Sequence, residues 1–277
     1  MRHLLATLGV VLVLAVIGAA PAAARVRMQP QGRAAQLLPV ARQQATVVLY
    51  GDSLAWEAED QFRDALTGAG VADVRTQTMG GTAICDWLDQ MRQDAVQLRP
   101  TAIVVEFSGN ALTPCMSDPA GTSLAVSRGT YRQKYIDDAV AVLSIFEPAG
   151  TRVYFAGAPR TRQAEETRDP DAGWLNALYA GLARGQADIR YVDAGASVLR
   201  RGHWTETLPC LGDEPCTGGM DTSGRAVNVV RAPDGGHFCP GAPGADRGVT
   251  GACAVWSSGA HRYGVAMASA LLADLPG

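Results

Sequence analysis

The sequence predicts a doubly wound α/β domain, in which helices cover both faces of a mostly parallel sheet. From about residue 45 to the end of the chain, short apolar runs alternate with stretches of helical periodicity. Chains with this alternation form parallel sheets, because the helix between two strands carries the chain back along the sheet. The strands are nearly continuous apolar runs, which is typical of strands buried on both faces.

The expected strands are short runs rich in β-branched and other apolar residues. They cover residues 45–50, 101–107, 151–156 and 189–193, with a weaker candidate at 71–79.

The expected helices have apolar residues spaced three or four apart, which places those residues on one face. Their stripes are Ala58, Phe62, Ala65 and Leu66; Leu88, Met91, Ala95 and Leu98; Tyr131, Tyr135, Ala139, Val142 and Phe146; and Trp174, Leu178 and Leu182. A last helix is expected from near Gly259 to Leu275. Aromatic residues on these stripes, such as Trp174, are expected in the core.

Two regions interrupt the alternation, at residues 114–129 and 199–256. The second is rich in Gly and Pro and contains four of the six cysteines. Long loops in a compact domain are usually functional or disordered, and disulfides in the second region argue against disorder.

The first residues resemble a secretory signal peptide. Arg2 precedes an uncharged run over residues 4–20, and small residues up to Ala24 offer a cleavage site. We therefore expect a signal at 1–24, a flexible leader at 25–44, a single domain at 45–277, and a secreted or extracytoplasmic protein. An uncleaved membrane anchor is the alternative, although no second apolar stretch is long enough to cross a bilayer.

The charge of the chain argues against nucleic acid as a partner. It has 24 basic and 27 acidic residues, a net charge of −3, and no cluster of basic residues. Loss of Arg2 with the signal would make the chain one unit more acidic.

The six cysteines are expected to form disulfides, because an exported protein meets an oxidising compartment. Six cysteines allow fifteen pairings. The simplest set joins near neighbours and the remaining two: Cys210–Cys216, Cys239–Cys253 and Cys85–Cys115. Zinc is the competing interpretation, since His203 and His237 lie near cysteines, but no Cys-x-x-Cys spacing occurs.

Four polar segments fall where chemistry is expected in such a fold. Ligands of an open parallel sheet collect outside the carboxyl ends of its strands. Three segments follow expected strands and the fourth lies on the loop before the last helix: Gly-Asp-Ser-Leu at 51–54, Gly-Gly-Thr at 80–82, Ser-Gly-Asn at 108–110 and Asp-Gly-Gly-His at 234–237.

Together these segments contain the parts needed for acyl transfer. Ser53 is a candidate nucleophile, and His237 a candidate base, because imidazole exchanges protons near neutral pH. Asp234 would orient the imidazole. Backbone N–H groups of Ser53 and Gly81 and the amide of Asn110 would stabilise the oxyanion. On its own, Ser or Asp at a helix start is more often only a cap.

The four segments, in this order, resemble the SGNH (GDSL) hydrolase family, whose name records its Ser, Gly, Asn and His. The resemblance implies a flavodoxin-like three-layer α/β/α fold and ester hydrolysis through a covalent acyl-serine. It assigns the nucleophile to Ser53, the acid–base pair to Asp234 and His237, and the oxyanion donors to Ser53, Gly81 and Asn110. Gly80 is the alternative register for the second donor.

The Asn block departs from the usual Gly-x-Asn-Asp, because Ser108 stands at its first position and Ala111 at its last. Four further residues are weaker candidates. Asp193 could replace Asp234 as the acid, Arg231 could bind an anionic substrate group, and Asp86 and Trp87 could line the pocket.

We therefore expect a secreted serine esterase that needs neither metal nor cofactor. Its partner would be a small-molecule or glycoconjugate ester, with short acyl groups on a carbohydrate or glycolipid. An acyltransferase would use the same acyl-serine with a sugar hydroxyl as acceptor. A non-catalytic carbohydrate-binding module on the same fold is the alternative from another class.

Overall fold

The computed structural model describes residues 41–240 and 253–276 and has a five-stranded parallel sheet at its centre. The strand order is β2-β1-β3-β4-β5. The strands are β1 (Thr46–Gly51), β2 (Asp73–Thr78), β3 (Ala102–Glu106), β4 (Arg152–Ala156) and β5 (Ile189–Val192). The predicted α/β class and all five strands, including the weaker second one, are confirmed.

The order of the strands places a topological switch point between β1 and β3. From these two strands the chain continues outward in opposite directions, to β2 on one side and to β4 and β5 on the other. Gly51 pairs with Thr78 on one side and Glu106 on the other, so the carboxyl ends of the three strands are level. A crevice outside these ends is where such sheets bind ligands.

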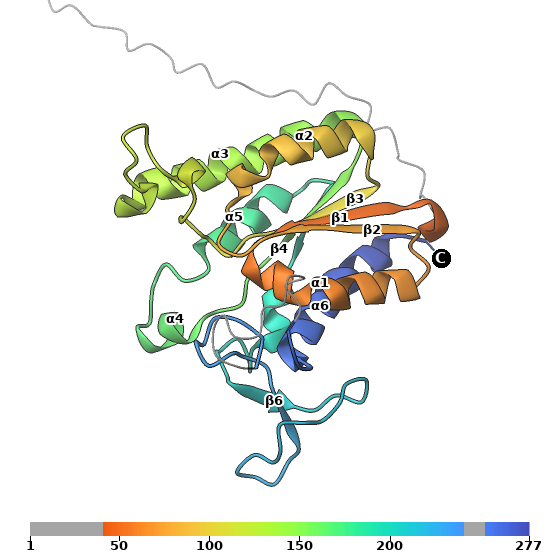
Figure 1. Ribbon diagram of the computed structural model, residues 1–277, viewed down its shortest axis with the longest axis vertical. Coiled ribbons are helices and arrows are strands. Elements are labelled where there is room, and N and C mark those ends of the chain that lie inside the picture. The colour runs from red at the N-terminus through yellow and green to blue at the C-terminus, as the bar shows by residue number, and fades with distance from the viewer. Residues whose placement is uncertain (1–40, 241–252, 277) are drawn as a thin grey trace, which may run out of the picture. The chain divides into compact units, whose positions relative to one another are not determined.

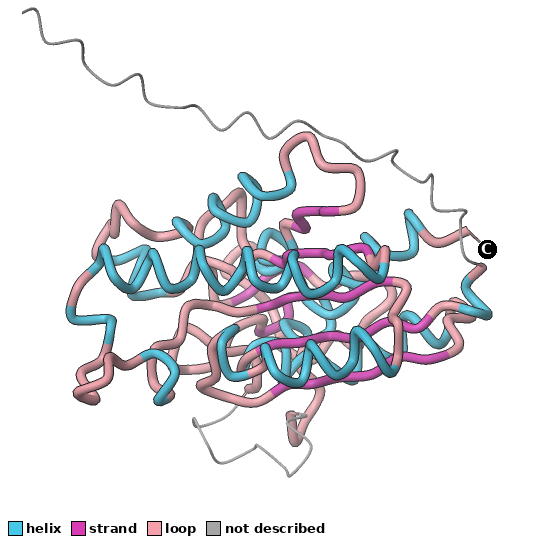
Figure 2. The backbone as a smooth tube through the Cα atoms, turned by 90° about the horizontal axis from the view of Figure 1, so that it is seen from above, coloured by secondary structure: helices cyan, strands magenta, loops and turns pink. Residues whose placement is uncertain are grey.

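Helices cover both faces of the sheet, as the three-layer prediction requires (Figure 1). The helices α1 (Ser53–Gly68) and α6 (Ser258–Asp274) lie on one face. The helices α2 (Leu88–Gln97), α3 (Arg128–Phe146) and α5 (Trp174–Ala183) lie on the other. In the view from above, helices and strands run along one common direction (Figure 2).

The alternation of side chains along β1 divides the core between the two faces. Val47 and Leu49 pack with α1 and α6, while Val48 and Tyr50 pack with the helices of the opposite face. Both sets are fully buried, which explains why the strand is a continuous apolar run.

The predicted stripe of α5 is displaced by one residue. Leu175 and Tyr179 are its buried residues, and the ring of Tyr179 stacks on Phe155 of β4 at 4.7 Å. Trp174 is only half-buried, although it packs against the same core. Because the stripe is one residue away from the expected position, Trp174 lies at the edge of the core.

The two irregular regions contain short elements that the sequence does not predict. The longer one includes a small antiparallel sheet of β6 (Thr207–Pro209) and β7 (Val227–Val229). Outside these two regions, a one-turn helix that the sequence does not predict, α4 (Arg162–Glu166), follows β4.

Six sulfurs form the three predicted disulfides, Cys85–Cys115, Cys210–Cys216 and Cys239–Cys253. No cysteine is therefore free to act as a thiolate, and the zinc interpretation requires cysteine thiolates as ligands.

The expected signal peptide at 1–24 lies outside the described residues, as does most of the expected leader at 25–44. The end of the leader is ordered, because Arg42 donates hydrogen bonds to the carbonyls of Leu272, Leu275 and Pro276. Among the described residues, no helix has the length and apolar character needed to cross a membrane.

The contact between α1 and α6 depends on a glycine. A Cβ at Gly264 would lie 2.7 Å from the carbonyl oxygen of Ala58 and 2.9 Å from the nitrogen of Phe62. Gly264→Ala should therefore push the helices apart and lower the free energy of unfolding by about 1–3 kcal/mol. Urea unfolding measures this.

Gly181 in α5 is the matched control, since a Cβ there meets no atom within 4 Å. Gly181→Ala should raise the free energy of unfolding by about 0.4–1 kcal/mol. Equal effects of the two substitutions would contradict the close packing of α1 on α6.

Candidate active site

Ser53 lies at the turn between β1 and α1. Asp52 is the N-cap of α1 and accepts a hydrogen bond from the backbone nitrogen of Leu54 at 3.0 Å. The capping role therefore belongs to Asp52, which leaves the hydroxyl of Ser53 available to another partner. Gly51 makes this turn possible, because a Cβ there would lie 2.8 Å from the carbonyl oxygen of Glu106.

The partner of the Ser53 hydroxyl is His237, although 184 residues separate them in the chain. His237 Nε2 lies 2.9 Å from Ser53 Oγ, and His237 Nδ1 lies 2.6 Å from Asp234 Oδ2. The structure thus joins the three residues in one hydrogen-bonded row. A base beside a hydroxyl, oriented by a carboxylate, can activate that hydroxyl for attack on a carbonyl.

The local turn holds Asp234 beside His237. Asp234 Oδ1 accepts hydrogen bonds from the backbone nitrogens of Gly236 and His237 at 2.8 and 3.0 Å. Gly235, at φ +77°, allows the chain to turn there. Partial burial alone would raise the pKa of Asp234, but the hydrogen bonds from Gly236 and His237 outweigh it, and the pKa lies below its usual value. Asp234 therefore remains an anion facing the imidazole.

Glu57 ties the histidine loop to the helix of the nucleophile. It lies one turn after Ser53 on α1, and its Oε2 accepts hydrogen bonds from the backbone nitrogens of Phe238 and Cys239 at 2.6 and 3.3 Å. Sequence reasoning missed this residue. The sequence signal that could have found it is its spacing, because Glu57 follows Ser53 by four residues and so lies on the same face of the helix.

The expected oxyanion donors differ in their surroundings. Within the described residues, the backbone nitrogens of Ser53 and Gly81 have no hydrogen-bond acceptor. Gly81, unlike Gly80, has a positive φ of +81°. The Asn110 amide donates to Asp52 Oδ2 at 2.9 Å and to the carbonyl of Thr82 at 3.3 Å, so it is held by both neighbours.

Asp52 is the centre of a hydrogen-bond network beneath these groups. Besides Leu54 and Asn110, it receives two hydrogen bonds from Ser108, from the backbone nitrogen at 2.7 Å and the hydroxyl at 2.6 Å. Ser108 is the residue that departs from the usual glycine of the Asn block. Its hydroxyl adds a donor to the buried carboxylate, so the departure strengthens the attachment of this segment.

A second buried carboxyl group, Glu106, lies close enough to Asp52 for the two side chains to affect each other's protonation. Both are fully buried. Glu106 Oε2 accepts from the nitrogen of Ala55 at 3.1 Å, and Glu106 Oε1 from the hydroxyl of Tyr263 at 2.9 Å. Sequence reasoning missed Glu106, although a glutamate inside an apolar strand is itself an unusual feature.

Glu106 favours its protonated form in the folded protein. Burial and the neighbouring charge of Asp52 raise the pKa of Glu106 well above its usual 4.5. Burial also raises the pKa of Asp52, although hydrogen bonds from Ser108 and Leu54 offset part of that increase. Because Asp52 has these donors, the pair favours the negative charge on Asp52 and the proton on Glu106.

The weaker candidates have structural roles. His237 Nδ1 already contacts Asp234, and Asp193 lies exposed after β5, so the substitute acid is not needed. Arg231 is 1% exposed, and its Nη2 donates to the carbonyl of Arg160 at 2.7 Å. It supports the histidine loop from beneath and is not presented to a ligand.

Asp86 and Trp87 support the segment that contains the second oxyanion donor. Asp86 Oδ2 accepts from the nitrogen of Ala83 and the hydroxyl of Thr113, both at 2.8 Å. Trp87 Nε1 donates to the hydroxyl of Thr82 at 3.1 Å. Both residues therefore hold residues 82–86 next to Asn110.

The protonated state of Glu106 predicts a pH-dependent stability. Unfolding exposes Glu106 to water, where it releases its proton near pH 4.5, so rising pH favours the unfolded state. Above about pH 4.5, the wild-type free energy of unfolding should fall relative to that of Glu106→Gln, by up to about 1.4 kcal/mol per pH unit. Urea unfolding at pH 5, 6.5 and 8 measures the difference.

Glu147→Gln, at an exposed glutamate, is the control and should follow the wild type at all three pH values. The amide introduced by Glu106→Gln resembles a protonated carboxyl, so this variant should fold. A constant difference between wild type and Glu106→Gln from pH 5 to 8 would show that Glu106 is ionised in the folded protein.

Solved structures with a similar chain path include two named hydrolases. A GDSL-like lipase from Bacteroides thetaiotaomicron is 13% identical with a TM-score of 0.42, covering 73% of this chain and 83% of its own. A catalytic mutant of an acetylxylan esterase from Geobacillus stearothermophilus is 9% identical with a TM-score of 0.44, covering 58% of this chain and 80% of its own. No curated protein sequence matches the chain.

One family model matches residues 46–242, which is most of the domain and includes all four polar segments. Its description is "Protein of unknown function (DUF459)". The chain belongs to this family, and through it to the SGNH (GDSL) hydrolases.

Proposed function

We propose that this protein is a secreted serine esterase that hydrolyses carboxylic esters through a covalent acyl-serine. One observation carries the proposal: the row of hydrogen bonds from Asp234 Oδ2 to His237 Nδ1 at 2.6 Å and from His237 Nε2 to Ser53 Oγ at 2.9 Å. The membership of the chain in the SGNH hydrolases supports the same reaction class.

The reaction has two halves with the same acid–base group. His237 Nε2 takes the proton of Ser53 as Oγ attacks the ester carbonyl, and then gives that proton to the departing alcohol. Water then enters, loses a proton to His237 and attacks the acyl-serine. The free acid leaves as Ser53 recovers its proton. Asp234 stabilises the positive charge that forms on the imidazole in both halves.

The oxyanion would be stabilised by the backbone nitrogens of Ser53 and Gly81, which have no other acceptor in the described part of the chain. The Asn110 amide would be the third donor, because its contact with Thr82 at 3.3 Å is long enough to exchange for an oxyanion. Asp52 holds the other hydrogen of that amide and so fixes its direction.

Small acyl groups fit the oxyanion side of the site. Two exposed apolar side chains, Met79 and Leu112, flank Gly81, and Leu112 Cδ1 lies 3.7 Å from the position of a Cβ on Gly81. Two such side chains give an apolar rim for a short acyl group. The substrates we propose are esters of short acids with a carbohydrate or glycolipid.

An extracytoplasmic location follows from the same proposal. Three disulfides support it, because they persist in oxidising compartments. We propose that residues 45–277 form the hydrolase domain, exported by the signal at 1–24.

A fluorophosphonate probe tests the nucleophile, because it reacts covalently with activated serine hydroxyls. The wild-type protein should be labelled and Ser53→Ala should not. Intact-protein mass spectrometry measures the adduct, and circular dichroism confirms that both proteins are folded. Equal labelling of the two proteins, or no labelling of folded wild type, would contradict the mechanism.

Asp234→Asn tests the orienting carboxylate. The asparagine keeps the Oδ1 acceptor of the turn but loses the charge opposite His237, so kcat for p-nitrophenyl acetate should fall by about a hundredfold or more. Asp89→Asn, at an exposed residue of α2, should leave kcat unchanged. If Asp234→Asn kept the wild-type kcat, a residue other than Asp234 would orient the imidazole.

A further inference from the structure

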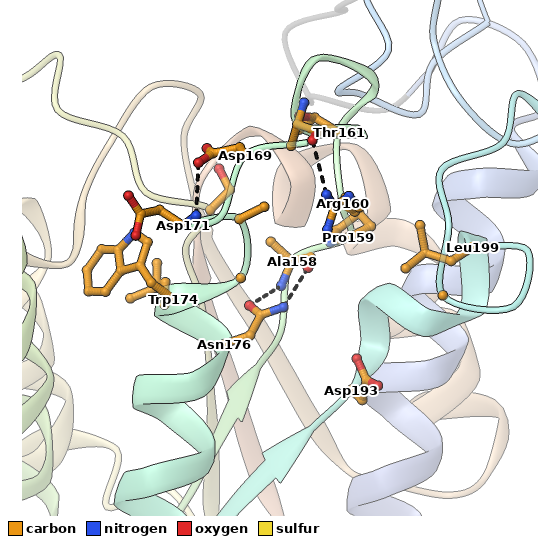
Figure 3. Close-up of a pocket in the computed structure, with 16 residues that line it drawn as sticks. Ala158, Pro159, Arg160, Thr161, Asp169, Asp171, Trp174, Asn176, Asp193 and Leu199 are labelled. Atoms are coloured by element: carbon orange, nitrogen blue, oxygen red, sulfur yellow. Dashed lines mark hydrogen bonds between the residues drawn. The ribbon is translucent and has the colours of Figure 1, made fainter. Parts of the chain in front are cut away.

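A cavity of about 320 Å³ opens at the carboxyl ends of β3, β4 and β5. Its walls come from the turn after β3, the segment after β4, the start of α5 and the segment after β5 (Figure 3). Polar residues in its lining include Ser108, Arg160, Asp169, Asp171 and Asp193. This volume is at the lower end of the range for small-molecule sites.

The cavity is next to the candidate active site. Ser108 lines it and is joined by two hydrogen bonds to Asp52, in the turn that carries the nucleophile. Both sites lie outside the same edge of the sheet, where the carboxyl ends of parallel strands meet. A substrate bound across Ser53 can therefore extend into the cavity.

The cavity lies on the histidine side of Ser53. Arg160 and Thr161 form part of its wall, and Arg231 beneath the histidine loop donates to the carbonyl of Arg160. The next residue, Arg162, donates from its backbone nitrogen to the carbonyl of Gly235 at 3.0 Å. The wall of the cavity and the loop of His237 are thus one connected structure.

This side of the site receives the leaving alcohol. In the proposed mechanism, the imidazole gives its proton to the alkoxide that departs, so the alcohol part of the ester must lie beside His237. In the same mechanism the carbonyl oxygen faces Gly81, and the short acyl group lies toward Met79 and Leu112. The position of the cavity therefore assigns it to the alcohol part.

The charges of the cavity limit the alcohols that fit. Arg160 pairs with Glu165 at 2.8 Å, and Asp171 pairs with Arg128 and Arg132. Asp169 and Asp193 have no ion pair within the described residues. In Figure 3, Asp169 and Asp193 lie on different walls of the cavity. Asp169 Oδ1 accepts a hydrogen bond from the backbone nitrogen of Asp171 at 2.9 Å. The two carboxylates would repel an anionic ligand, and their remaining acceptor positions would accept hydrogen bonds from hydroxyl groups.

We propose that this cavity binds the alcohol part of the ester, and that this part is an uncharged polyhydroxylated unit such as a sugar. The inference rests on the proposed esterase function and adds the place where the alcohol part binds and the residues that bind it. Asp169 and Asp193 each accept hydrogen bonds from its hydroxyl groups.

Two esters with the same acyl group test the cavity. For 6-O-acetylglucose the alcohol is a sugar, whereas p-nitrophenyl acetate has no hydroxyl to bind. The ratio of kcat/KM for the first ester to that for the second should fall about tenfold or more in Asp169→Asn and in Asp193→Asn. Asp89→Asn, on the exposed face of α2, should leave the ratio at the wild-type value.

Calorimetric titration of the Ser53→Ala protein with 6-O-acetylglucose tests the cavity without turnover. Saturable binding that Asp193→Asn weakens, together with the lower ratio, supports the proposal. An unchanged ratio in both variants, or no saturable binding, overturns it even if p-nitrophenyl acetate is hydrolysed. If the wild type hydrolyses neither ester, the esterase proposal fails, and the titration alone decides for or against the cavity.

Discussion

The negative charge of Asp52, buried beneath the nucleophile, is the constraint on which the rest of the site depends. An ionised carboxylate is stable inside a protein only when hydrogen-bond donors surround it. Asp52 obtains them from the first turn of α1 and from the segment after β3, through Leu54, Ser108 and Asn110. Its charge thereby fixes the serine and the asparagine relative to each other.

Glu106, the carboxyl group beside Asp52, connects the same buried pair to further elements of the fold. Two adjacent buried carboxyl groups cannot both be ionised at low cost, so one retains a proton. Protonated Glu106 bridges β3 to α1 through Ala55 and to α6 through Tyr263. Glu57 then connects α1 to the histidine loop, and so buried acidic side chains link α1, the end of β3 with the segment after it, α6 and the histidine loop.

The sequence predicts the fold and the reacting groups because these depend on local pattern. Apolar runs predict the strands, and Ser53 and His237 stand in short motifs. The supporting residues were not predicted, because their function depends on partners far away in the chain. Glu106 and Tyr263 are separated by 157 residues, and Glu57 and Phe238 by 181. The hairpin of β6 and β7 was missed because its strands are only three residues long.

The strand order separates the chemistry from the choice of substrate. Asp52, Ser53 and Asn110 stand at the switch point between β1 and β3, where buried hydrogen bonds leave little freedom for change. The cavity is built from segments after β4 and β5, in which Asp169 and Asp193 are exposed. An exposed side chain there can change without disturbing the buried carboxyl pair. The loop of His237 contacts both parts, because it reaches Ser53 on one side and Arg162 on the other. In the proposed mechanism, residues after β4 and β5 would discriminate between alcohols, and they are joined to the reacting groups through the histidine loop and through Ser108.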